Sequence, residues 1–208
     1  MGIDLKNKGQ MFLISSIIII VILVILKVSV NLPNVIEEKK EFESRFEKEF
    51  FTNIENNLQR VTEISYHQPE NITTNVFDFA NFTRKTMNER LSTFNFLYVD
   101  AITSYSESKM NVTVINLLNK PINVSLVLND SQYDTMDNIN DVSSWITNFN
   151  INPGDDYILT IFYDNQFEGN LTVLTKMAKN TYSGFFDVTL IGSEETYKNK
   201  FQNSYTLP

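Results

Sequence analysis

Few side chains in this sequence are of the types that carry out chemistry. The chain has no cysteine and a single histidine, His67, so disulfides, thiolate metal sites and thiol nucleophiles are excluded, and no second imidazole can complete a metal site. Asp155, Asp156 and Asp164 are carboxylates near expected strand ends, but their spacing matches no calcium-binding loop. Phosphate-binding glycine loops and the motifs of serine hydrolases and zinc proteases are absent. We therefore expect no enzymatic activity, no metal site and no cofactor, with His67 on the surface or in packing.

Charge and composition narrow the class of partner. The formal net charge is −8, and the basic residues form no long run. Because neutralising phosphates needs clustered Lys or Arg, nucleic acid is excluded as a partner. Apolar residues make up 42% of the 208 residues, including 16 Phe and 9 Tyr, which predicts a folded core that relies on buried aromatic rings.

One stretch near the start carries the most specific physical message. Residues 11–26 read MFLISSIIIIVILVIL, apolar except for two serines. A membrane-spanning helix needs about 20 residues, and extension through Leu32 supplies that length if Lys27 snorkels to the interface. We expect a transmembrane helix within residues 1–32, with the lipid bilayer as partner, carried by Met11, Phe12, Leu13, Ile17, Ile20 and Leu26.

The flanks of the apolar stretch predict its orientation. Lys6 and Lys8 precede it, and the residues after Pro33 are rich in glutamate. The positive-inside rule then places the N-terminus in the cytoplasm. The expected protein is a single-pass protein of the cell membrane, with its C-terminal domain outside.

Three interpretations fit this segment. A cleaved secretory signal peptide needs small residues at the cleavage site, and Val28-Ser29-Val30 match that requirement poorly. A plain signal anchor needs only the apolar helix. The third is a prepilin-type leader, which is trimmed before the helix while the helix itself is kept.

The third interpretation rests on the residues directly before the helix. Lys8-Gly9-Gln10 followed by a long apolar run resembles the class III signal peptides of archaeal type IV pilins and related surface proteins. The resemblance implies a prepilin peptidase that cuts between Gly9 and Gln10, and self-assembly or contact with other surface subunits through the apolar helix. The family often has Ser and Glu where this sequence has Phe12 and Ile14, so a minor pilin or pilin-like surface protein is implied.

Residues 33–96 read as a helical stalk. Pro33 is expected to break or kink the first helix. A second helix is expected over residues 74–94, and the two would form a helical hairpin. In the stretch after Pro33, before that second helix, apolar residues recur at steps of four or three, and charged residues fill the opposite face. The apolar residues are Phe42, Phe46, Phe50, Ile54, Leu58 and Val61.

Residues 97–208 read as a β-rich ectodomain. Trp145 is the expected core anchor, residues 129–142 are an expected loop, and Pro153-Gly154 fit the centre of a type II turn. Seven short strands separated by turns predict an antiparallel immunoglobulin-like β-sandwich and an α+β protein overall. The expected strands cover residues 97–103, 110–118, 122–128, 145–151, 157–163, 169–175 and 185–191.

Six Asn-X-Ser/Thr motifs are candidate glycosylation sites if this part of the chain is exported. They begin at Asn71, Asn81, Asn111, Asn123, Asn129 and Asn170. With the resemblance, these features predict a membrane-anchored structural or adhesive surface protein of pilin-like type. The alternative is a single-pass subunit of an envelope complex, or a binding module, held by a plain signal anchor.

Overall fold

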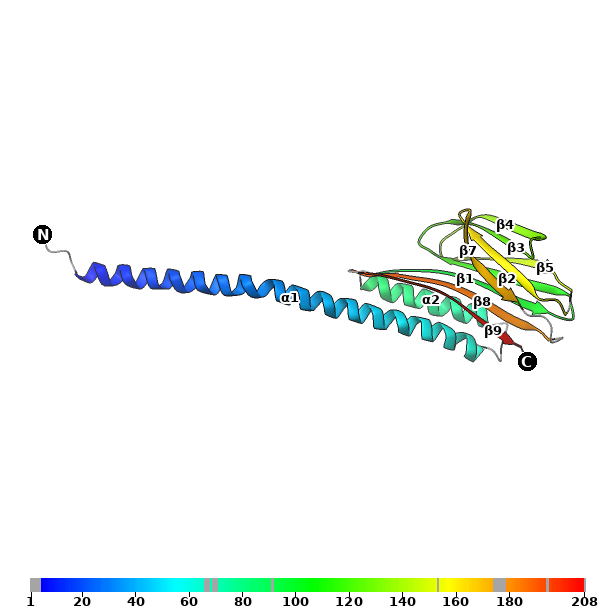
Figure 1. The fold of residues 1–208 in the computed structure, drawn as a ribbon, viewed down its shortest axis with the longest axis horizontal. Helices are drawn as coiled ribbons and strands as arrows, with labels where there is room; N and C mark the ends of the chain where they lie inside the picture. Colours follow the sequence, from blue (N-terminus) through cyan, green and yellow to red (C-terminus); the bar gives the residue numbers. More distant parts are fainter. Residues whose placement is uncertain are drawn as a thin grey trace. The chain divides into compact units, whose positions relative to one another are not determined.

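The protein is α+β, with one long N-terminal helix followed by a unit that is mostly antiparallel sheet. The computed structural model describes residues 5–65, 68, 71–90, 92–152, 154–173, 179–193 and 195–207 (Figure 1). The chain divides into two compact units, residues 1–46 and residues 47–208. Helix α1 (Leu5–Ser65) begins in the first unit and ends in the second.

Helix α1 runs through Pro33 without interruption, so the expected break at this residue is wrong. A proline lacks one backbone N–H, and it therefore removes one hydrogen bond to the preceding turn. The turns on both sides keep their own hydrogen bonds, and a helix of 61 residues holds many such turns. The expected boundary between an anchor and a separate stalk helix is therefore not a break in the backbone.

The unit from residue 47 onward contains two antiparallel sheets. The five-stranded sheet has the order β5-β2-β1-β8-β9, and the four-stranded sheet has the order β4-β3-β6-β7. The first is built from β1 (Thr93–Ser104), β2 (Lys109–Leu117), β5 (Ser143–Asn150), β8 (Thr181–Ile191) and β9 (Thr196–Thr206). The second is built from β3 (Ile122–Leu128), β4 (Gln132–Ile139), β6 (Tyr157–Tyr163) and β7 (Gln166–Val173).

The sheets pack face to face as a β-sandwich, because they share one apolar core. Alternation along β3 shows how the sequence directs this packing: every second side chain is buried, and those between them are exposed or half-buried. The core between the sheets includes Leu97, Val99, Val112, Val114, Val124, Leu126, Leu159, Ile161, Leu171 and Phe185.

A second apolar core lies on the outer face of the five-stranded sheet. Helix α2 (Ile72–Glu89) and the last turns of α1 cover that face with Ile72, Val76, Leu58 and Ile54. On the sheet side, β1 contributes the stacked aromatic rings of Phe94, Phe96 and Tyr98 to this core. The ring centroids lie 6.0 Å apart for Phe94 and Phe96, and 6.1 Å apart for Phe96 and Tyr98. β1 and β8 are thus buried on both faces, which makes them the centre of the unit.

Two expectations from the sequence, one about a loop and one about the end of a helix, are corrected by the structure. The expected loop over residues 129–142 contains β4, an edge strand whose only buried side chain is Ile139. The expected helix over residues 74–94 ends at Glu89, and Phe94 belongs to β1. The amide of Ser92 donates to the carbonyl of Met87 at 3.1 Å, which closes the helix before the strand starts.

The C-terminal strand β9 was not expected, and Trp145 is less central than expected. β9 pairs with β8 along its whole length. Trp145 is half-buried and packs against the edge of the core between the sheets. The turn after β5 agrees with its prediction: Gly154 has a φ of 102°, and Asp155 N–H donates to Asn152 O at 3.2 Å.

Candidate functional site

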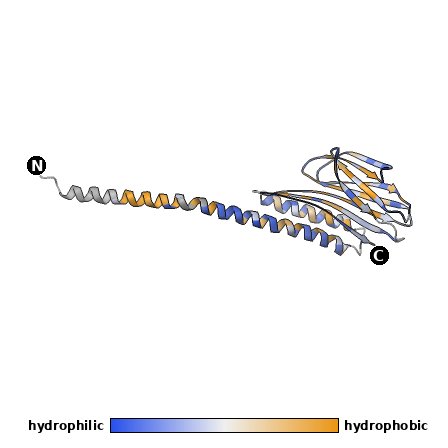
Figure 2. Cartoon of the chain, in the orientation of Figure 1, coloured by the Kyte–Doolittle hydropathy of each residue, from blue (hydrophilic) through white to orange (hydrophobic). Residues whose placement is uncertain are grey.

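The first candidate site is the apolar segment of α1. All ten side chains from Ile17 to Leu26 are between 50% and 59% exposed, so the segment is apolar on every side of the helix. Figure 2 shows this segment as a continuous hydrophobic stretch. Within the part of the chain that the structure describes, α1 is the one helix long and apolar enough to cross a membrane.

An apolar surface around a whole helix needs an apolar environment. Burying a Leu or Ile side chain away from water stabilises a protein by about 1.5–3 kcal/mol. An amphipathic helix buries the side chains of one face only. Of the expected membrane-spanning set, Ile17, Ile20 and Leu26 lie in this exposed apolar segment. The side chains of Met11, Phe12 and Leu13 lie outside the described side chains. Lipid tails would cover the whole circumference, and hydrogen bonds inside the helix satisfy its backbone.

The candidate cleavage site lies in the first turns of the same helix. Gly9 and Gln10 belong to α1, which begins at Leu5. Their side chains are outside the described set, so only the helical backbone is known at this place.

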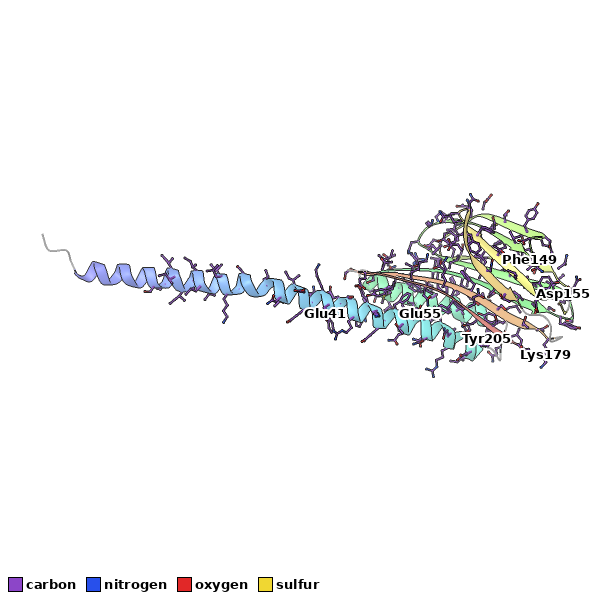
Figure 3. All side chains as sticks on the ribbon, viewed as in Figure 1. Glu41, Glu55, Phe149, Asp155, Lys179 and Tyr205 are labelled. Atoms are coloured by element: carbon purple, nitrogen blue, oxygen red, sulfur yellow. The ribbon has the colours of Figure 1, made fainter. Side chains whose placement is uncertain are left out.

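The helix changes character after the apolar segment. Glu41, labelled in Figure 3, accepts a hydrogen bond from Arg45 at 3.2 Å, and Lys39 pairs with Glu43 at 3.4 Å. These pairs at i,i+4 are typical of a helix surface in water. Phe42 is an apolar exception among them, with 70% of its surface exposed.

A buried carboxylate lies beneath the start of α2. Asp100 is fully buried, and its Oδ2 accepts a hydrogen bond from Thr73 Oγ1 at 2.5 Å, while Oδ1 has no hydrogen-bond partner among the described atoms. Burial raises the pKa of Asp100 to about 6. Nearby, the hydroxyls of Tyr98 and Tyr182 share a hydrogen bond of 2.9 Å. Tyr98, Asp100 and Tyr182 are all fully buried, so they form a polar cluster inside the second core.

A group of charged side chains from three strands lies at the edge of the sandwich formed by β7. Lys200 of β9 contacts Glu168 of β7 and lies 3.5 Å from Asp187 of β8, measured from Nζ to Oδ2. Lys198 lies 3.7 Å from the same Asp187 oxygen. Gln202 donates to the carbonyl of Asn170. Side chains of β9 thus cover backbone and carboxylate acceptors of the edge strand β7, which blunts that edge.

The six candidate glycosylation sites differ in exposure. Asn71 and Asn81 are half-buried. Thr83, which completes the motif at Asn81, is buried, and its hydroxyl donates a hydrogen bond to Phe79 O at 2.9 Å. Asn111 and Asn123 are exposed, but Thr113 and Ser125 are buried or half-buried. In the motifs at Asn129 and Asn170 both the asparagine and the hydroxyl residue are exposed.

A shallow hollow joins those last two motifs. It has a volume of about 510 Å³ and lies on the outer face of the four-stranded sheet. Ile158 and Phe167 on its wall are 49% and 59% exposed. The lining consists of Asn129, Asp130, Ile158, Thr160, Phe167 and Asn170.

The remaining candidate residues are not brought together as a site. His67 lies outside the described residues. Asp164 accepts a hydrogen bond from Lys120 Nζ at 2.6 Å, and this bond lowers the pKa of its carboxyl, so Asp164 is the ion-pair partner of Lys120. Across the described ranges, no group of three or more metal-ligating side chains is found. No protein-family model matches the chain, and no curated protein matches it.

Proposed function

We propose that this chain is a membrane-anchored surface protein of pilin-like type, with a structural or adhesive role and no enzymatic activity. The observation that carries the proposal is the fully apolar segment of α1, exposed on every side from Ile17 to Leu26. It continues as a charged helix into a folded β-rich unit. The resemblance of Gly9-Gln10 to a prepilin leader implies that the leader is trimmed and that this apolar helix is kept as the anchor.

The orientation is argued from charge. Lys6 and Lys8 lie before the apolar segment, and Glu37 and Glu38 follow it. With the N-terminus in the cytoplasm, the basic residues stay on the side that the positive-inside rule favours. The sandwich then lies outside the cell membrane, where Asn129 and Asn170 are the glycan acceptors that exposure favours.

The sheet order supports the immunoglobulin-like description. β2 pairs with β5 in one sheet and β3 pairs with β6 in the other. The chain crosses between the two sheets four times, and this pairing of strands that are not consecutive is typical of a Greek key. β8 and β9 extend the first sheet beyond such a core. The last turns of α1 and helix α2 pack on the outer face of this sheet and supply the proposed helical hairpin.

The second candidate is a subunit of an envelope complex held by a plain signal anchor. In such a complex Phe42, an aromatic side chain 70% exposed on a charged helix, would be a contact point for another protein. Phe12 and Ile14, which depart from the pilin pattern, point the same way.

Two measurements on cells that express the full chain separate these proposals. Alkaline carbonate extraction should leave the protein in the membrane fraction, and release into the supernatant would overturn the anchor. Mass spectrometry of the mature N-terminus then distinguishes the two kinds of anchor. A chain that starts at Gln10 supports prepilin processing, and one that starts at Met1 or Gly2 supports the plain anchor.

A further inference from the structure

The charge cluster between β7, β8 and β9 has a geometry that goes beyond an ordinary surface ion pair. Asp187 and Lys200 are directly opposite each other in the antiparallel register of β8 and β9. Lys200 Nζ lies 3.5 Å from Asp187 Oδ2, and it also donates to the backbone carbonyl of Glu168 at 2.9 Å. The Glu168 carboxylate contacts the same Nζ. One amine is therefore held between two carboxylates from two different strands.

The two carboxylates of the cluster are largely shielded from water. Asp187 is 4% exposed, and the side chain of Glu168 is 7% exposed. Gly169, next to Glu168, leaves room for the ring of Phe185, since a Cβ at this glycine would lie 2.7 Å from Phe185 Cε2. Phe185 is on the same face of β8 as Asp187, so an aromatic ring borders the carboxylate.

The pKa values of both reacting groups are raised, for different reasons. Desolvation raises the pKa of Asp187, although Lys198 and Lys200 oppose the shift. For Lys200, desolvation lowers the pKa, but the hydrogen bond to Glu168 and the charge of Asp187 outweigh it, and the pKa is raised. The resting amine is therefore protonated, and any reaction at Nζ needs an adjacent base. Glu168 is in contact with that nitrogen and can serve as this base.

We propose that Lys200 and Asp187 join in an intramolecular isopeptide bond, with Glu168 as the catalytic proton carrier. Glu168 takes a proton from the Lys200 ammonium, and the free Nζ attacks Cγ of Asp187. The C–N bond forms, and a C–O bond of the carboxyl breaks. Glu168 passes this proton to one carboxyl oxygen, then takes a second proton from the newly attached nitrogen and passes it to the same oxygen, which leaves as water. Overall, one ammonium and one carboxylate become one amide and one water, with no oxidant and no co-reactant.

The fold supplies the driving forces that this condensation lacks in water. Fixing the amine beside the carboxyl replaces a bimolecular encounter by a step with an effective concentration on the order of 10⁵ M or more. The neutral amide also removes two charges from a site where they are poorly solvated. The chain has no cysteine for a disulfide, so the amide would be a covalent staple between its last two strands.

Lys198 provides a matched control in the same strand. It lies 3.7 Å from the same Asp187 oxygen, and its side chain is 51% exposed, against 32% for Lys200. Its contact with Asp187 is an ion pair that resembles the one under test. Glu168, however, is paired with Lys200, so we expect Lys198 to remain an unmodified lysine.

The experiment is peptide mass spectrometry of the full chain, purified in detergent and digested with trypsin. We expect a branched species in which residues 180–198 are joined to residues 199–208, lighter by one water than the two peptides together. Lys200 should resist cleavage in that species, because its amine is blocked. This region contains none of the six Asn-X-Ser/Thr motifs and is remote from the leader, so the result is independent of the proposed function.

Three variants sharpen the outcome, each checked for native Trp145 fluorescence before digestion. Lys200→Arg keeps the charge but cannot form the amide, so the branched species should vanish. Glu168→Gln keeps the shape but removes the base, and should reduce the branched fraction at least tenfold. Lys198→Arg should leave it unchanged. Separate unmodified peptides from the folded wild-type chain would overturn the proposal and leave ion pairs only, as would a branch that survives Lys200→Arg.

Discussion

The two halves of α1 use apolar side chains in opposite ways. From Ile17 to Leu26 every side chain is apolar, and each keeps half or more of its surface exposed. From Phe51 onward the apolar residues form a stripe, and Ile54 and Leu58 are 2% and 0% exposed. The first pattern has no polar face to present to water, whereas the second packs one face against the five-stranded sheet.

This difference shows that apolar content alone does not say what a helix does. Spacing decides: a run that is apolar on all sides needs an apolar solvent, and steps of three and four need a protein core. Both patterns occur within one helix, which runs through Pro33 without interruption. The same kind of substitution, made in each half of α1, should therefore have different effects, and equal effects would contradict the comparison.

The largest difference is expected for leucine-to-alanine substitution in the two halves. Leu58→Ala removes a fully buried side chain and should lower the free energy of unfolding by about 4 kcal/mol. Leu23→Ala, at a position 59% exposed, should leave that free energy unchanged. Urea denaturation of the full chain in detergent, followed by the fluorescence of Trp145, measures both. Equal effects would contradict the division of α1 into two environments.

A charge placed in the apolar segment should impair membrane insertion and leave the stability of the sandwich unchanged. Leu23→Arg should disfavour membrane insertion by about 3 kcal/mol, because a guanidinium near the centre of a bilayer is poorly solvated. The same variant should keep the urea midpoint of the sandwich. The membrane-bound fraction after carbonate extraction measures the first effect, and Lys48→Arg serves as a control in the charged part of the helix. A fraction equal to wild type would count against a membrane-spanning role.

A charge buried in the second core should make stability depend on pH. The pKa of Asp100 is raised from 3.8 to about 6 in the folded state. Its contribution is complete below about pH 4 and is lost as the pH rises through 6, a difference of about 3 kcal/mol. Asp100→Asn should therefore stabilise the unit at pH 8, by up to that amount, and have little effect at pH 4. Urea midpoints at both pH values test this, and a gain at pH 4 alone would contradict it.

Much of the fold could be predicted from the sequence, and the misses have physical causes. β3 and β6 were expected with the bounds that they have, because one face of each strand is buried and apolar. β4 carries almost no such signal, since only Ile139 is buried in this polar edge strand. β9 spaces its aromatic residues Tyr197, Phe201 and Tyr205 four apart, a step more typical of a helix than of a strand.

The candidate sites were predictable to the extent that they are local. The apolar segment is a property of consecutive residues, so its composition alone indicates a membrane-spanning helix. The cluster of Glu168, Asp187 and Lys200 brings together strands that are far apart in the sequence or joined by a turn. Neither periodicity nor a motif marks its members, and only the register of β8 and β9 and the contact between the sheets reveal it.

The smallest expected effect tests where along α1 the change of environment occurs. Phe50 is half-buried, packs against the second core and lies beneath Arg90, whose Cζ is 5.8 Å from the ring centroid. Phe50→Ser should lower the free energy of unfolding by about 1–2 kcal/mol, through lost apolar contact. Phe42→Ser, two turns earlier and 70% exposed, should change it by less than about 0.5 kcal/mol. Thermal unfolding of both variants in one detergent gives the comparison.

If Phe42→Ser is the more destabilising of the two, the core extends further along the helix than the buried stripe indicates. If it leaves stability intact but abolishes the capture of another envelope protein, Phe42 is the contact point that distinguishes a complex subunit from a pilin-like anchor.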